Sequence, residues 1–146
     1  VLDALLEPTR IYVKSIRSVL LQCPGAIHSL AHITGGGITE NLNRALPSTL
    51  DAEIQVGSWN MVPILPWVCR AAHLNETEAL KTFNMGLGMI LAVAPQKAEE
   101  VAQLLADAGE EVYIVGQVVP GVGKVVYLDE EELFAAYSED EEVEED

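Results

Sequence analysis

The chain has 146 residues and is 49% hydrophobic, which fits one globular domain large enough to bury a core. Its net charge of −15 is unevenly spread, because residues 129–146 hold 11 of the 23 acidic residues and none of the 8 basic ones. Clustered Lys and Arg are missing, which excludes nucleic acid as an expected partner. No apolar run reaches the length of a membrane span, so no membrane partner is expected either.

The first half of the chain alternates between strand and helix patterns. β-Branched and aromatic residues predict a short strand over 8–15, and apolar residues at helical spacing predict a helix over 14–22. A strand over 26–34 then runs into three glycines. The helix that follows is predicted over 38–46, with Thr39 or a neighbour as its N-cap.

The second half continues the alternation. In chain order we expect a strand (52–57), two helices separated by Asn75 (63–74 and 76–83), a strand (86–95), a helix (96–109) and two strands around a Pro-Gly-Val-Gly turn (110–119 and 124–129). The expected fold class is therefore α+β, a layered α/β/α domain in which helices cover a central mixed sheet.

The ends and the cysteines give further expectations. The chain begins with Val1, so we expect a processed chain or a fragment. Cys23 and Cys69 lack any metal-ligand spacing and fit buried thiols in a reducing cytosol better than a disulfide. The body is predicted to end at residue 128, and residues 129–146 are predicted to form a disordered, self-repelling acidic tail.

The glycines at 35–37 are the strongest local signal for a binding site. A strand that leads through them into a helix surrounds one point with unpaired backbone amides, which suits a phosphate or an oxyanion. The spacing matches neither a Walker loop nor the dinucleotide fingerprint. The alternative is a tight turn that only needs positive φ. The flanking residues His32, Thr34, Glu40 and Asn41 favour a binding loop.

Four segments together resemble the C-terminal half of aminoimidazole ribonucleotide synthetase, also called phosphoribosylformylglycinamidine cyclo-ligase. They read LLEPTRIYVKS, AHITGGGITENLNRALP, GSWNMVPILPWV and TFNMGLGM, and the resemblance spans residues 2–128. It implies the fold of that domain and a cytoplasmic enzyme of purine biosynthesis. It also implies a missing N-terminal domain that binds most of the ATP and Mg²⁺ and forms a homodimer. The 146 residues alone are then expected to be inactive.

The resemblance also implies roles for individual residues. The implied substrate is formylglycinamidine ribonucleotide, with its phosphate on Thr34 and Gly35, Gly36 and Gly37. His32 is the catalytic candidate, because it can polarise the formyl oxygen or move a proton, and the equal alternative is that it shapes the loop.

Weaker candidates surround this set. Glu40 and Asn41 are expected either to cap the helix or to contact substrate, and Asn84 is a further substrate contact. His28 shares a strand face with His32, but without a third ligand we expect no metal site.

For the remaining candidates we prefer a structural role. His73 is predicted to be a surface or capping residue, and Arg10 and Lys14 are predicted to be exposed cations on one strand face. Trp59 and Trp67 are predicted to be core or interdomain residues.

Two other classes of function remain open from the sequence. Formylglycinamidine ribonucleotide synthase, selenophosphate synthetase and thiamine-phosphate kinase share the two-domain plan. A non-catalytic phosphate-binding or interaction module is the second alternative.

Overall fold

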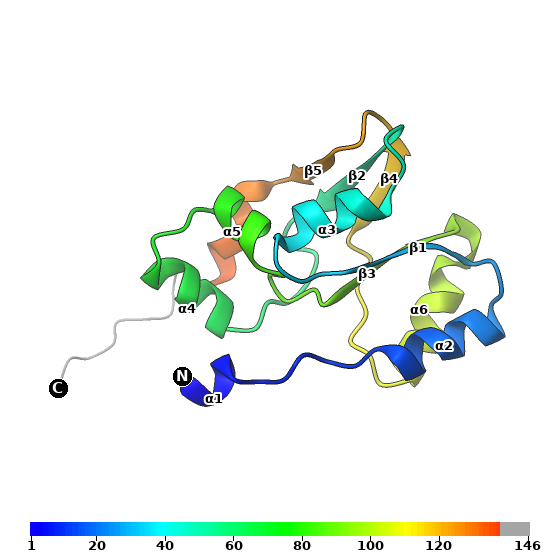
Figure 1. Cartoon of the computed structure of the whole chain (residues 1–146), viewed down its shortest axis with the longest axis horizontal. Coiled ribbons are helices and arrows are strands. Elements are labelled where there is room, and N and C mark those ends of the chain that lie inside the picture. The colour runs from blue at the N-terminus through cyan, green and yellow to red at the C-terminus, as the bar shows by residue number, and fades with distance from the viewer. Residues whose placement is uncertain (138–146) are drawn as a thin grey trace.

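Two small β-sheets organise the fold of the computed structural model, which describes residues 1–137 (Figure 1). In the first sheet, β1 (Ile27–His32) pairs antiparallel with β3 (Met89–Val93). In the second, β2 (Leu50–Gln55) lies between antiparallel β4 (Gly116–Pro120) and parallel β5 (Val125–Leu128). The α+β class with a mixed sheet is confirmed, but the strands divide between two sheets instead of forming a single central one.

Helices cover these sheets in layers (Figure 1). Helix α2 (Val13–Gln22) packs on α6 (Ala98–Asp107), and their small core takes up apolar side chains from one face of the β1–β3 sheet. Helix α3 (Gly37–Ala45) packs on β1 and on α5 (Glu76–Thr82), and the main core lies here and extends to β2 and the last helix. The helices are α1 (Leu2–Leu5), α2 (Val13–Gln22), α3 (Gly37–Ala45), α4 (Ile64–Ala71), α5 (Glu76–Thr82), α6 (Ala98–Asp107) and the 3₁₀ helices η1 (Pro95–Lys97) and η2 (Glu130–Tyr137).

The strand predicted over 8–15 is wrong. Helix α2 begins at Val13, and the residues just before it make no regular element. Arg10 holds this segment in place through its side chain, donating to Glu110 at 2.7 Å and to the carbonyl of Gly109 at 3.0 Å. A side-chain tether therefore replaces the expected β-ladder, although the β-branched composition resembles that of a strand.

The disorder predicted from residue 129 does not hold for the first part of the acidic segment, which is folded. Residues 130–137 form η2, whose Leu133 is buried in the main core. The Tyr137 hydroxyl donates to the Met61 carbonyl at 2.7 Å and accepts from the Met61 amide at 3.1 Å. Leu133, Phe134 and Tyr137 anchor the helix on the main core, so the acidic composition alone misled the prediction. The rest of the predicted tail lies outside the described residues.

The Pro-Gly-Val-Gly turn does not join a hairpin, since β4 and β5 lie on opposite sides of β2. Asp51 holds the turn across the strand, because its Oδ1 accepts from the amides of Val122 and Lys124 at 2.8 Å each. These backbone bonds lower the pKa of Asp51 below its usual value. Among the described helices, none is long and apolar enough to cross a bilayer.

Candidate functional site

The glycine loop connects β1 directly to α3 and is held at both ends by backbone bonds. The amide of Ile33 donates to the carbonyl of Gly88 at 2.9 Å, and the amide of Gly37 donates to the carbonyl of Thr34 at 3.1 Å. Gly36 is the N-cap of α3 in the left-handed conformation, with φ of +95°, and no side chain caps the helix. The predicted Thr39 cap is wrong, because its hydroxyl bonds Tyr127 at 2.7 Å and the carbonyl of Leu80 at 3.3 Å instead.

Buried Asn41 supports the loop from inside the helix. Its amide nitrogen lies 3.2 Å from the carbonyls of Thr34 and Gly35 and 2.8 Å from that of Gly37. Its Oδ1 accepts from Arg44 at 2.6 Å. Since an amide group carries two N–H donors and both are turned toward these carbonyls, Asn41 fixes the loop's shape. The geometry gives it a supporting role and leaves its amide no hydrogen for a ligand.

The loop presents unpaired donors at the start of α3. Where β1 leads into α3, no acceptor within residues 1–137 is found for the backbone amides of Thr34, Gly35, Gly36, Ile38 and Thr39, of which Ile38 is buried. The first amides of a helix have no intrahelical partner, and the helix dipole adds positive potential at the same place. This arrangement can bind an anion such as a phosphate.

The three glycines serve different purposes. A Cβ on Gly37 would overlap the carbonyl of Leu80, so this glycine lets α3 approach α5. Gly36 needs its positive φ for the turn, and a Cβ there would overlap the side chain of Glu40. Gly35 is exposed, without positive φ, and a Cβ there would meet nothing within 4 Å. Only Gly35 therefore leaves open space at the surface.

Glu40 places a negative charge close to these amides. It is exposed, and its carboxylate lies over Gly36, where it suits the positive end of α3. An anion that approached over Gly36 would meet this carboxylate. The Gly35 side of the loop is therefore the better approach for a phosphate.

His32 is the last residue of β1 and is exposed beside the loop. The ring of Tyr12 meets it edge-on, with the ring centroids 6.0 Å apart and the planes at 71°. Burial, and then the charge of Glu110, raise the pKa of Tyr12. Sequence reasoning missed Tyr12. The residue in the sequence that could have indicated it is Gly88, since a glycine at the start of a strand permits close packing. In the structure, a Cβ on Gly88 would overlap the Tyr12 hydroxyl.

The other predicted site residues lie in less suggestive places. His28 is exposed on the same face of β1 as His32, and no three His, Cys, Asp or Glu side chains within residues 1–137 gather to hold a metal ion. The side-chain oxygen of Asn84 accepts a hydrogen bond from the amide of Gly86 at 2.9 Å, which closes the turn that contains both residues. His73 is exposed just after α4, with φ of +55°.

The predicted surface cations and tryptophans separate in the fold. Arg10 is paired with Glu110, whereas Lys14 lies exposed in the first turn of α2, so they do not share a strand face. Trp59 is buried and its indole N–H donates to the carbonyl of Met85 at 2.8 Å. Trp67 is partly exposed on α4.

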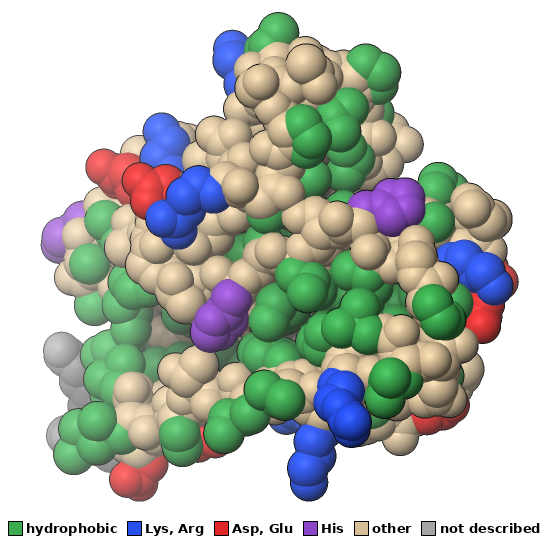
Figure 2. Space-filling view, turned by 45° about the vertical axis from the view of Figure 1, so that its right-hand side comes forward, with side chains coloured by type: hydrophobic (Ala, Val, Ile, Leu, Met, Phe, Trp, Pro, Cys, Tyr) green, Lys and Arg blue, Asp and Glu red, His purple; other side chains and the backbone are tan. Residues whose placement is uncertain are grey.

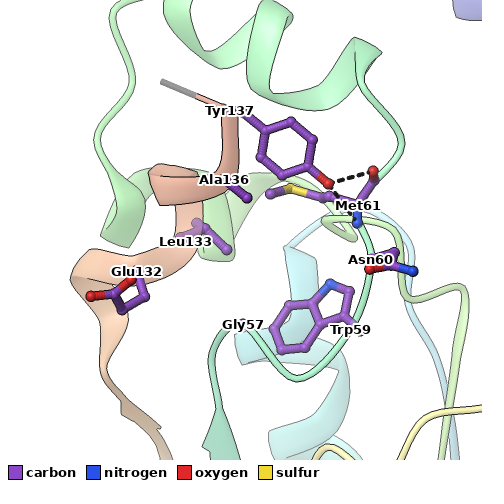
Figure 3. Close-up of a pocket in the computed structure, with 8 residues that line it drawn as sticks. All are labelled: Gly57, Trp59, Asn60, Met61, Glu132, Leu133, Ala136 and Tyr137. Atoms are coloured by element: carbon purple, nitrogen blue, oxygen red, sulfur yellow. Dashed lines mark hydrogen bonds between the residues drawn. The ribbon is translucent and has the colours of Figure 1, made fainter. Parts of the chain in front are cut away.

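Two hollows lie elsewhere on the molecule. A cavity of about 110 Å³ next to η2 is lined by Trp59, Met61, Leu133 and Tyr137 among others (Figure 3). A groove of about 980 Å³ lies between the two sheets and is mostly apolar. Figure 2 shows hydrophobic side chains gathered across a hollowed part of one face. Neither hollow is lined by the three glycines, of which Gly35 is exposed, Gly36 partly exposed and Gly37 buried.

The fold and the loop define an α+β domain with a glycine-rich strand-to-helix junction. Residues 1–129 match the family model described as "AIR synthase related protein, C-terminal domain". The chain therefore belongs to the AIR synthase related family and contains its C-terminal domain, which confirms the resemblance seen in the four sequence segments.

Curated relatives are similar over most of this chain. Proteins named phosphoribosylformylglycinamidine cyclo-ligase are 46% identical over 125 residues in Brevibacillus brevis and 47% identical over 118 residues in Nitrosococcus oceani. The matches cover 86% and 81% of this chain, but only 36% and 32% of the relatives. The chain thus spans about a third of the length of these relatives.

Solved structures share the fold at lower identity. Two crystal structures of Escherichia coli HypE, described as a hydrogenase maturation protein, are 24% identical to this chain, with TM-scores of 0.61 and 0.62. They cover 81% and 86% of this chain, and the matches span 35% and 40% of the HypE chains. At this identity the likeness shows the fold alone.

Proposed function

We propose that this chain is the C-terminal, substrate-binding part of a phosphoribosylformylglycinamidine cyclo-ligase. The observation that carries the proposal is the 46% identity to a relative of that name over 125 residues, which include the glycine loop. The HypE likeness does not bear on the substrate, because one fold serves unrelated reactions.

The proposed reaction closes the imidazole ring of aminoimidazole ribonucleotide. ATP phosphorylates the formyl oxygen of formylglycinamidine ribonucleotide, an amidine nitrogen attacks the activated carbon, and phosphate leaves. Such chemistry needs donors for anionic oxygens and accurate positioning of the reacting groups. The unpaired amides of the glycine loop suit the first need, and Gly35 leaves room for the substrate phosphate.

His32 is proposed to act on the formyl oxygen or on a proton of the amidine. Its imidazole is exposed at the edge of the loop, where a ligand bound by the loop amides lies within reach of the same strand end. Thr34 is an exposed residue whose hydroxyl lies 3.5 Å from Asn41 Oδ1, and it is proposed to turn this hydroxyl to the phosphate. Asn41 and Asn84 are proposed only as supports of their turns, since their side chains are bonded to backbone groups.

ATP and Mg²⁺ are assigned to the remainder of the longer protein. Mg²⁺ is usually held by one or two carboxylates together with substrate phosphates, so its site is proposed to form with the bound ATP. The proposed partners are accordingly the ATP-binding N-terminal domain and a second copy of the whole protein in a homodimer. A cytoplasmic setting fits this proposal.

The proposal is tested by assaying the full-length protein for ATP-dependent formation of aminoimidazole ribonucleotide from formylglycinamidine ribonucleotide. We expect turnover by the full-length protein and none by the 146-residue chain alone. His32→Asn should lower kcat, whereas the control His73→Asn should not, since His73 is exposed and asparagine tolerates its φ of +55°. ADP release with other substrates but not with this one would overturn the proposal.

A further inference from the structure

Tyr12 lies where a side chain can control the orientation of His32. It directly precedes α2 and is partly buried, while His32 is exposed. The edge-on contact, with centroids 6.0 Å apart, is the single aromatic ring pair within residues 1–137. Edge-to-face pairs at this separation are attractive, so the contact limits the rotamers that the imidazole can adopt.

The hydroxyl end of Tyr12 is seated on the neighbouring strand. It occupies the space over Gly88 that a Cβ would otherwise fill. Gly88 precedes Met89, the residue paired with His32 across the sheet, and the carbonyl of Gly88 accepts the amide of Ile33. The ring, the glycine and the end of β1 therefore pack as one unit beside the glycine loop.

The chain on both sides of Tyr12 is tied to the turn after α6. Arg10 forms an ion pair with Glu110 at 2.7 Å, and Ser15 donates its hydroxyl to the other oxygen of the same carboxylate. Glu110 is largely buried in this arrangement, with 12% of its side chain exposed. The ring is thus carried by a segment anchored at two points, which keeps its position fixed relative to the sheet.

We propose that Tyr12 is a positioning residue that holds the imidazole of His32 in one orientation at the edge of the glycine loop. The catalytic consequence of this inference rests on the proposed function. The contact between Tyr12 and His32 does not depend on that function, and it is measured separately. Residues 10–15, part of the segment that the sequence predicted as a strand (8–15), then belong to the support of the site.

The first test is an NMR measurement on the 146-residue chain. The ring-current shifts of the His32 imidazole protons should persist in Tyr12→Phe, which keeps the ring, and vanish in Tyr12→Leu. Gly88→Ala should displace the ring and alter the His32 signals as well, but it should cause no further change in a Tyr12→Leu background. The His73 signals serve as the internal reference. Wild-type His32 shifts in Tyr12→Leu would overturn the proposal.

The second test uses turnover by the full-length protein. Tyr12→Leu should lower kcat about tenfold with KM changed less than about twofold, because a misoriented group loses transition-state contacts and leaves substrate binding intact. Tyr12→Phe should retain kcat. The leucine substitution should have no further effect in a His32→Asn background, and an additive loss would overturn the positioning role. If His32→Asn proves fully active while the NMR coupling persists, the catalytic part of the proposed function fails and the orienting contact stands.

Discussion

At the scale of single residues, three adjacent glycines meet three different local environments. Gly35 faces open space, Gly36 adopts positive φ beneath the carboxylate of Glu40, and Gly37 lies against the backbone of α5. Alanine substitutions at these positions can therefore distinguish an effect on substrate binding from an effect on the free energy of unfolding. Gly36→Ala cannot serve as this probe, because the φ of +95° at Gly36 makes any alanine there strained.

Gly35→Ala should leave the free energy of unfolding nearly unchanged, whereas Gly37→Ala should lower it by about 1 kcal/mol or more. The reason is that only Gly37 combines positive φ with backbone atoms in the space of a Cβ. Urea unfolding of both variants measures the difference. If the loop binds the substrate phosphate, Gly35→Ala should also weaken substrate binding in the full-length protein. Equal stability of the two variants would contradict this account of the packing.

Tyr127 gives a residue-scale prediction about pH. Burial raises its pKa to about 12, with the hydrogen bond to Thr39 acting in the opposite direction. An unfolded tyrosine ionises near pH 10, so the folded chain keeps a neutral phenol where the unfolded chain has lost its proton. The contribution of the neutral Tyr127 phenol to the free energy of unfolding is therefore fully present below about pH 10, and it is lost as the pH rises to about 12.

The measurement is the free energy of unfolding of the wild type and of Tyr127→Phe at a series of pH values. The wild type should lose about 2 to 3 kcal/mol more than the variant between pH 10 and pH 12. Other tyrosines with raised pKa, such as Tyr12, are present in both proteins and cancel in the comparison. Parallel curves would show that Tyr127 titrates normally in the folded chain.

At the scale of elements, η2 shows how a few apolar anchors fold an acidic segment. Its acidic residues remain at the surface while Leu133 enters the main core and Tyr137 closes onto Met61 (Figure 3). Thr77 on α5 adds a hydrogen bond to Glu130 at 2.5 Å. The element therefore belongs to the domain, although its charge composition resembles that of a tail.

Leu133→Ala should lower the free energy of unfolding by about 2 kcal/mol or more, because it leaves a cavity in the main core. Leu128→Ala is the matched control, since this leucine is exposed on β5 and should cost less than about 1 kcal/mol. Removal of residues 138–146 is predicted to leave the unfolding midpoint nearly unchanged. A neutral Leu133→Ala would mean that η2 does not contribute to the fold.

At the scale of the whole molecule, the N-terminal segment carries large apolar side chains without cover in the described chain. Helix α1 lies apart from both sheets (Figure 1), and the segment exposes Leu2, Leu6, Ile11 and Val13, with Ile11 81% exposed. Large apolar side chains exposed together on one segment favour association. In the Trp59–Trp67 segment, by contrast, Trp59 is buried, and Val62 and Trp67 are the large apolar residues that remain exposed.

We expect the 146-residue chain to self-associate at high concentration through this N-terminal surface. In sedimentation equilibrium, the double variant Leu6→Ser with Ile11→Ser should have a lower average mass than the wild type. Val122→Ser is the control, because Val122 is 70% exposed but lies on the turn of the other sheet. A strictly monomeric wild type at high concentration would contradict the expectation.

The sequence by itself determined the features that depend on near neighbours in the chain. Periodicity predicted α2, α3, α6 and most strands, and Asn75 indeed separates two helices, where it forms a capping box with Glu78. The α+β class followed from the alternation of these elements. The order of four motifs gave the family, since such long segments carry far more information than any one residue.

Only the tertiary structure decided the features that join distant segments. Gly37 meets Leu80, Tyr12 covers Gly88, and Tyr137 bonds Met61, and each pair lies far apart in the sequence. These contacts leave no periodic signature, because each involves single residues whose partners are brought together by the fold. For the same reason the strand predicted at 8–15 was wrong, and so was the disorder predicted for residues 130–137. Their composition was read correctly, but side-chain partners in other elements decided their structure.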